Sequence, residues 1–193
     1  DIVIHSATKY LGGHSDICAG AIASSKKHID QIWNLAKNLG GSLSEYTVWL
    51  LERSMKTLAL RVWAQNNNAK QIAEWLTENP LVSQVFYPGL TSHPNHQLAK
   101  KQMNGFTGML SFELEKSVNS KKFLNSLQLI KPSMSLAGVE STILAPSKAS
   151  HALLGEKERK KQGISEGLLR FSVGIEDFDD LILDLKQAFT NSY

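Results

Sequence analysis

Residues 43–79 contain neither Gly nor Pro, the two residues that most often interrupt a helix. Apolar residues recur there with a period near 3.6, which predicts a short helix at residues 45–53 and a long one at 56–78. The helix has to end before Pro80, because a residue that precedes proline avoids the α region. An uninterrupted helix of this length is typical of a bridge between two domains. The sequence therefore predicts domains at residues 1–64 and 65–193.

The segments on either side of this helix predict an α/β fold. Before it, two short apolar runs read as buried strands at residues 1–4 and 17–23, followed by a helix at 27–39. After it, we expect strands at 83–87, 108–114 and 168–173, and helices at 95–103, 121–127 and 178–189. The four tryptophans are expected to be packing residues: Trp33, Trp49, Trp63 and Trp75.

Composition excludes several classes of protein. With 42% hydrophobic and 20% charged residues in 193, the chain is not intrinsically disordered. A net charge of +3 gives no support for nucleic-acid binding, and no apolar run approaches the roughly 20 residues that cross a bilayer. Cys18 is the only cysteine, which predicts a reducing compartment. The first residues read as a strand already in progress, so we expect a piece of a longer protein.

The strongest chemical candidate is Lys9, which follows the first strand and precedes a Gly-containing turn. A lysine in a partly apolar pocket is more often the neutral amine that forms a Schiff base with an aldehyde. Ser6 and Thr8 place hydroxyls beside it, and hydroxyls near a turn can hold a phosphate. This combination suits pyridoxal phosphate, a cofactor that acts as an electron sink. The alternative is a solvated lysine at the end of a strand.

Several segments resemble the Cys/Met-metabolism family of pyridoxal-phosphate enzymes, which includes cystathionine β- and γ-lyases, cystathionine γ-synthase, methionine γ-lyase and O-acylhomoserine sulfhydrylases. The lysine segment SATKYLGGHSD at residues 6–16 carries the resemblance first. Four others follow in order: MKTLALR (55–61), YPGLTSHPNH (87–96), LAGVES (136–141) and LRFSVGIED (169–177). Shorter matches lie at residues 150–151 and 163–165, so the resemblance spans the whole chain.

The resemblance implies an aspartate-aminotransferase type fold (fold type I). Residues 1–64 would end the large cofactor domain and residues 65–193 would form the small domain, so the chain would be the C-terminal portion of the protein. It also implies pyridoxal 5′-phosphate as cofactor, a cytoplasmic homotetramer, and no metal, nucleic acid or membrane partner. Lys9 would bind the cofactor covalently and move protons, while Ser6 and Thr8 would bind its phosphate. Arg170 would bind the α-carboxylate of an amino-acid substrate, with Ser141 nearby.

Arg170 also has a physical argument of its own, because a planar guanidinium suits bidentate recognition of a carboxylate. Ser141 lies in a Gly-containing loop, where serine most often serves as a turn or cap residue. His93 and His96 have a spacing that could suit a metal, but no second cluster completes a site, so we expect structural roles. Residues 157–161 form a charge run that we interpret as a solvated face.

The exact reaction is predicted from one position. Members of the family that act at Cγ often carry Glu where this chain has Met134, whereas several β-lyases carry a non-acidic residue. Met134 therefore favours cystathionine β-lyase over the γ-synthase, γ-lyase and sulfhydrylase alternatives. The family's aspartate at the cofactor ring nitrogen and its stacking aromatic residue precede the lysine and cannot be located in this chain. A non-catalytic fragment that serves packing or assembly is the alternative from another class.

Overall fold

A hairpin and two helices make up the first of two compact units, Asp1–Leu60. The computed structural model describes all 193 residues. Strands β1 (Ile2–Ser6) and β2 (Gly20–Ser24) pair antiparallel, with Ile4 opposite Ile22 and Ser6 opposite Gly20. Helix α1 (Lys26–Leu39) begins at Ser25, whose side chain accepts from the His28 amide, and α2 (Glu45–Met55) begins at Ser44 in the same way.

The hairpin strands are exposed, which corrects the expectation that both are buried. Ile2, Val3 and Ile4 are 47%, 53% and 73% exposed. Both strands carry apolar residues on both faces, as strands inside a large sheet do, but here β1 and β2 form a sheet of only two strands. The apolar pattern was interpreted correctly as strand, and burial did not follow because this unit places no second layer on them.

The second unit, Arg61–Tyr193, is built on a five-stranded sheet of order β3-β4-β7-β6-β5. The strands are β3 (Val82–Phe86), β4 (Met109–Leu114), β5 (Lys131–Pro132), β6 (Thr142–Leu144) and β7 (Leu168–Ser172). All neighbours are antiparallel except β5 and β6, which are parallel. Helix α3 (Leu58–Thr77) crosses the division between the units, which falls four residues before the boundary expected after residue 64.

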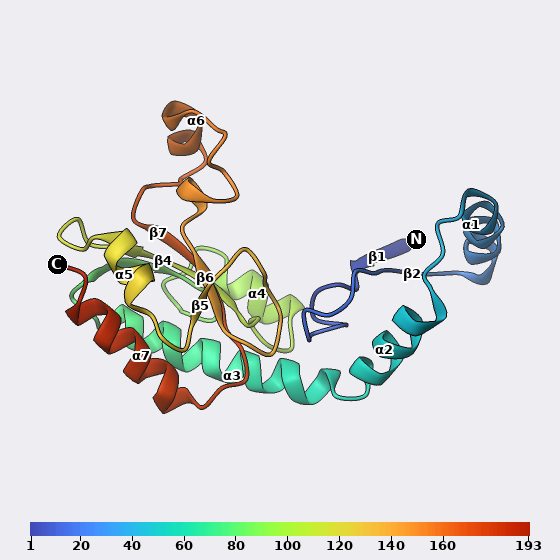
Figure 1. Cartoon of the computed structure of the whole chain (residues 1–193), viewed down its shortest axis with the longest axis horizontal. Helices are drawn as coiled ribbons and strands as arrows, with labels where there is room; N and C mark the ends of the chain where they lie inside the picture. Colours follow the sequence, from blue (N-terminus) through green and yellow to red (C-terminus); the bar gives the residue numbers. More distant parts are fainter. The chain divides into compact units, whose positions relative to one another are not determined.

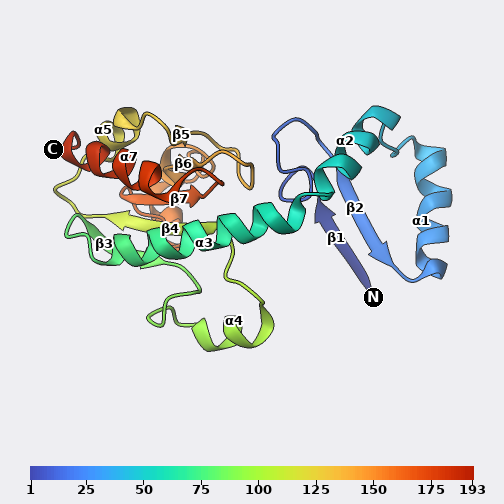
Figure 2. The same ribbon diagram turned by 90° about the horizontal axis from the view of Figure 1, so that it is seen from below.

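One face of this sheet carries the core. Helices α3 and α7 (Phe178–Thr190) run side by side across it (Figures 1 and 2). Because side chains alternate along a strand, one set of residues on β4, β6 and β7 turns toward these helices. The core includes Ile72 and Leu76 from α3, Leu181, Leu185 and Phe189 from α7, and Leu110, Phe112, Ile143, Leu169 and Phe171 from the sheet.

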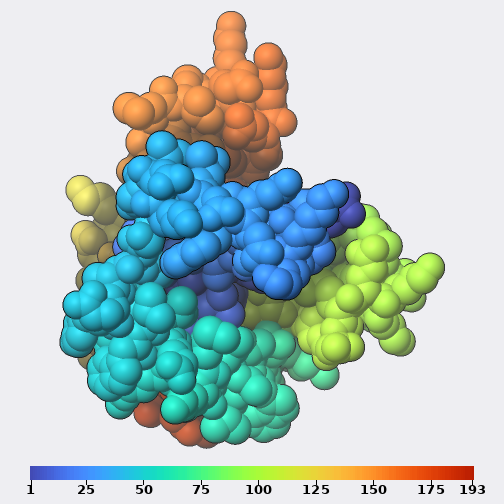
Figure 3. All heavy atoms as spheres, turned by 90° about the vertical axis from the view of Figure 1, so that its right-hand side faces the viewer, coloured from blue at the N-terminus to red at the C-terminus, as the bar shows by residue number.

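The remaining elements lie at the margins of the second unit. Helix α5 (Ser120–Ser126) packs beside α7, whereas α4 (His96–Gln102) and α6 (Glu156–Lys161) project outward as separate lobes in the space-filling view (Figure 3). A 3-10 turn, η1 (Pro146–Lys148), follows β6. None of the helices combines the length and apolar character needed to span a membrane.

The tryptophans correct another expectation. Trp33, Trp49 and Trp63 are 59%, 56% and 72% exposed, so their helical spacing did not indicate packing within this chain. Only Trp75 behaves as expected, because it packs against the core with its ring centroid 6.2 Å from that of Phe189.

Candidate functional site

Lys9 lies in a tight turn that leaves β1. Its backbone amide donates to the Ser6 carbonyl (3.1 Å), and its own carbonyl accepts from the Gly13 amide (2.7 Å). The Gly12 amide donates to the carbonyl of the fully buried Ala7 (2.8 Å). Gly13 has φ +70°, a conformation that glycine adopts without strain. These backbone bonds fix the conformation of the turn. Lys9, which lies in this turn, is half-buried.

The two hydroxyls beside Lys9 differ in what they contact. Thr8 Oγ1 accepts from the Ala19 amide (2.9 Å) and donates to the Ala19 carbonyl (3.2 Å), so its proton is used within the protein. These bonds attach the lysine turn to the segment that leads into β2. Ser6 is exposed and its hydroxyl makes no hydrogen bond within the chain. Of the predicted phosphate-binding hydroxyls, Ser6 is therefore the one with a free donor.

Arg170 lies on β7, in the middle of the second unit's sheet. Its cross-strand neighbours are Ser111 on β4 and Leu144 on β6. Its Nη2 atom donates to the carbonyls of Met134 (2.9 Å) and Ser135 (3.2 Å), which hold one end of the guanidinium. Its Nε atom is buried and has no hydrogen-bond partner. Burial lowers the pKa of Arg170 from its ordinary value, and this direction reflects a partly desolvated cation.

A buried donor without an acceptor is uncommon, because leaving it unpaired costs roughly 1–3 kcal/mol. The Nε of Arg170 is such a donor on a group that is positively charged. Because the Nε atom has almost no accessible surface, an anionic oxygen reaches it only when the atoms that cover it shift, and would then recover this cost and add a charge-assisted bond. Arg170 is thus suited to receive a carboxylate.

Ser141 is completely buried and serves as a junction between two segments. Its Oγ accepts from the Gly174 amide (2.9 Å) and donates to Oε2 of Glu176 (2.9 Å), while its amide donates to Oε1 of Glu176. A side chain on Gly174 would meet the Val139 carbonyl at 2.2 Å, so the close approach needs glycine. Since the hydroxyl proton of Ser141 goes to Glu176, this geometry favours a structural role over the expected contact with substrate.

Sequence reasoning missed Glu176 as a member of this cluster. It lies among acidic residues at the start of α7, where negative charge is favourable in any case because of the helix dipole. Asp177 does cap that helix, through bonds to the amides of Asp179 and Asp180. The signal that separates Glu176 from its neighbours is its place two residues after Gly174, at the end of a buried strand.

The predicted site residues fall into two groups by unit. Ser6, Thr8 and Lys9 belong to the first unit, and Ser141 and Arg170 to the second. Within the second unit, Ser141 and Arg170 hydrogen-bond to different partners, Glu176 and the carbonyls of Met134 and Ser135. His96 donates from Nδ1 to the Pro88 carbonyl (2.8 Å) and its ring stacks on Phe106, which is a structural arrangement.

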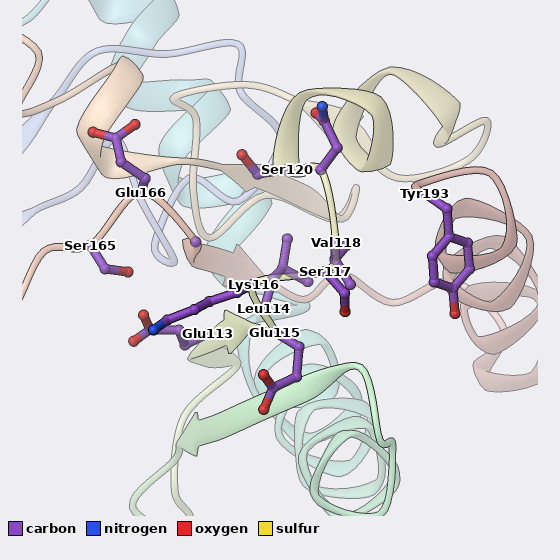
Figure 4. Close-up of a pocket in the computed structure, with 12 residues that line it drawn as sticks. Glu113, Leu114, Glu115, Lys116, Ser117, Val118, Ser120, Ser165, Glu166 and Tyr193 are labelled. Atoms are coloured by element: carbon purple, nitrogen blue, oxygen red, sulfur yellow. The ribbon is translucent and has the colours of Figure 1, made fainter.

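A hollow of about 730 Å³ in the second unit lies away from these residues. It is bounded by the end of β4, the start of α5, residues 165–167 and the chain end, with Glu113, Glu115, Glu166 and Tyr193 among its lining side chains (Figure 4). None of the predicted site residues lines it. No group of three or more metal-ligating side chains occurs anywhere in the structure.

Known proteins similar to this chain share both sequence and fold. The model of the family described as "Cys/Met metabolism PLP-dependent enzyme" matches residues 1–190. A cystathionine β-lyase of Lactococcus lactis subsp. cremoris is 47% identical over 189 residues, 97% of this chain and 50% of the relative. A chloroplastic cystathionine γ-synthase of Arabidopsis thaliana is 48% identical over 97% of this chain and 34% of its own length. A cystathionine γ-lyase of Bacillus subtilis is 44% identical over 99% of this chain and 51% of its own length.

Solved structures agree. The cystathionine γ-lyase of Lactobacillus plantarum in complex with L-serine superposes with a TM-score of 0.93 at 41% identity, covering all of this chain and 51% of the neighbour. The cystathionine γ-synthase of Xanthomonas oryzae pv. oryzae gives 0.92 at 40% identity, over 99% and 50%. The chain therefore spans about half the length of most of these proteins. The expected fold type is confirmed for the part of it that this chain covers.

Proposed function

Because this chain belongs to the Cys/Met-metabolism family of pyridoxal-phosphate-dependent enzymes, we propose that the intact protein makes or breaks carbon–sulfur bonds in cystathionine and homocysteine metabolism. The activity we favour is that of a cystathionine β-lyase, which converts cystathionine to homocysteine, pyruvate and ammonia. The observation that carries the proposal is Arg170, whose buried Nε lacks an acceptor while Nη2 is held by two carbonyls.

The residues of the lysine turn fit the family's cofactor. Pyridoxal phosphate presents an aldehyde and a phosphate, and this turn offers the half-buried Lys9 amine and the unengaged Ser6 hydroxyl. When bound, the cofactor delocalises the electron pair left at the substrate Cα. Lys9 would hold the cofactor and then accept the Cα proton at Nζ. Ser6 would donate to the phosphate, and Thr8 would hold the turn through Ala19.

Arg170 would orient the amino-acid substrate. The Nε proton would be donated to one oxygen of the α-carboxylate, with Nη2 kept in place by the Met134 and Ser135 carbonyls. A substrate held by its carboxylate has its Cα proton in a fixed position, which is the condition for efficient transfer to a base. We assign Ser141 to the support of the adjacent loop, through Glu176 and Gly174.

The cofactor role is tested by Lys9→Ala in the full-length protein. We expect the wild type purified with pyridoxal phosphate to absorb at the edge of the visible range, and the variant to lose both that band and all turnover. Lys56→Ala, an exposed lysine in the same unit, is the matched control and should retain the band. A full-length protein that takes up no cofactor would contradict the proposal.

Products distinguish the reactions that relatives of this chain catalyse. With L-cystathionine, pyruvate plus homocysteine indicates a β-lyase, and 2-oxobutyrate plus cysteine indicates a γ-lyase. An O-acylhomoserine with cysteine tests the synthase activity. We favour the β-lyase because Met134 supplies no carboxylate where members acting at Cγ often have Glu. Conversion of L-cystathionine to 2-oxobutyrate instead would overturn that choice.

The state of the intact protein belongs to the same proposal. We propose a cytoplasmic location, in keeping with the single cysteine. We also propose that the protein is a homotetramer, as the resemblance implies. The domain assignment is likewise proposed: residues 1–64 as part of the cofactor domain and 65–193 as the small domain. Native mass spectrometry of the holoenzyme tests the assembly, with four chains and four cofactors as the expected mass.

A further inference from the structure

Residues 133–137 form a loop that three strand side chains attach to the sheet face opposite the core. Thr142 Oγ1 donates to the Ser135 carbonyl (2.8 Å), and Ser172 Oγ accepts from the Ala137 amide (2.7 Å). Arg170 Nη2 donates to the Met134 and Ser135 carbonyls. Arg170 and Ser172 are two residues apart on β7, so both side chains leave the same face, and Thr142 is directly opposite Ser172.

The loop needs this attachment because part of it is strained. Ala137 has φ +66°, the left-handed region that residues with a Cβ rarely adopt. Its amide donates to a hydroxyl that is itself almost fully buried, since Ser172 is 1% exposed. In such a water-excluded position no solvent molecule replaces the lost acceptor. Ser172 therefore determines whether the backbone at Ala137 keeps its conformation.

Arg170 depends on the same loop. The two carbonyls that hold Nη2 belong to residues just before Ala137, and the Ser135 carbonyl accepts from both Arg170 and Thr142. If the loop relaxes, these carbonyls move and the guanidinium loses its anchor. The Nε atom would then point in several directions. Binding of the substrate would have to offset the entropic cost of ordering the arginine side chain.

We propose that Ser172, supported by Thr142, is a positioning residue for carboxylate binding by Arg170. It acts through the loop 133–137 and does not touch the substrate. The inference rests on the proposed function, in which Arg170 receives the α-carboxylate. It goes beyond that function because it identifies the side chains that hold the Arg170 guanidinium in one orientation before the substrate binds.

The test compares Ser172→Ala with Ser111→Ala in the full-length holoenzyme. Ser111 lies on the same sheet face, directly opposite Arg170 on β4, and its hydroxyl makes no hydrogen bond within the chain. Hydrogen exchange of the peptide covering residues 133–141 reports on the loop, and steady-state kinetics with L-cystathionine report on Arg170. Thr142→Val, which keeps the side-chain shape and removes the donor, provides a second variant if Ser172→Ala folds poorly.

For Ser172→Ala we expect faster exchange in this peptide and a KM about tenfold higher, with kcat changed less than about threefold. Thr142→Val should raise KM by a smaller factor, and Ser111→Ala should change neither quantity. Faster exchange with an unchanged KM, or an unchanged exchange rate, overturns the inference and leaves the proposed function standing. A wild-type holoenzyme that turns over none of the cystathionine or homoserine-ester substrates overturns the proposed function, and the inference falls with it.

Discussion

Ala137 is one of three non-glycine residues with a left-handed backbone, together with Ser15 and Thr107. It is fully buried at φ +66°, so replacement by Gly removes about 1–2 kcal/mol of strain. The same replacement loses a buried methyl, about 0.8 kcal/mol, and adds backbone entropy to the unfolded chain, about 0.5–1 kcal/mol. These effects nearly cancel, and Ala137→Gly should change the free energy of unfolding by less than about 0.5 kcal/mol.

Ala145 provides the matched comparison. It is also buried, and its φ of −90° and ψ of 111° carry no strain. Ala145→Gly should therefore lower the free energy of unfolding by about 1.5 kcal/mol, since no relief offsets the two losses. Urea unfolding of both variants measures the difference. Equal destabilisation by the two substitutions would show that the left-handed conformation of Ala137 costs nothing.

The sequence indicates candidate site residues better than it indicates the groups that their side chains contact. Arg170 was predicted to bind a carboxylate from the chemistry of its guanidinium and from the resemblance, and its side chain carries a buried, unpaired Nε donor. The hydroxyls of Thr8 and Ser141 were predicted to face ligands, yet both donate to groups of the protein itself, Ala19 and Glu176. Sequence shows that a hydroxyl is present but not which acceptor takes its proton, because that acceptor comes from a distant segment.

Besides its packing in the core, helix α7 is attached through one buried carboxylate to the segment that precedes β5. Asp184, which is 6% exposed, accepts from the backbone amides of Gln128, Leu129 and Ile130 at 2.8–3.0 Å. Asp184→Ala would leave these donors without their acceptor, and we expect a loss of about 3 kcal/mol in the free energy of unfolding. Asp180→Ala, an exposed position on the same helix, should cost less than about 1 kcal/mol. Similar losses in the two variants by denaturant unfolding would contradict this role.

Long elements with an apolar stripe were predicted within a few residues, as were the short helices α4 and α5, whereas β5, β6 and α6 were missed. Helices α1, α2, α3 and α7 each present a clear period or cap. Strand β6 has three residues and β5 two, too few for alternation to register. Helix α6 has no buried residue, so its charge run carries no apolar signal. Strand β6 forms because it pairs with β7, and the residues of β7 lie far from those of β6 in the sequence.

The two units differ in what holds them together. The second contains the whole hydrophobic core cluster, from Ala69 to Phe189. In the first, the only buried hydrophobic residues are Ala7 and Ala19. Fixing the backbone of one residue costs about 1–2 kcal/mol of conformational entropy. The burial of two alanines offsets only a small part of that cost for a unit of sixty residues. Local hydrogen bonds and helix caps shape the first unit, but they do not supply the stabilisation that burial supplies to the second.

This contrast predicts how the units behave when separated. A fragment of residues 58–193, which keeps all of α3, should unfold cooperatively, and Leu185→Ala in its core should cost about 2–5 kcal/mol. A fragment of residues 1–60 should be largely unfolded, with weak helical circular dichroism and no thermal transition. Leu39→Ala, at a position 75% exposed, should not change that spectrum. A cooperative transition in residues 1–60 would mean that the hairpin, α1 and α2 bury their apolar faces against one another, which their exposure in this structure argues against.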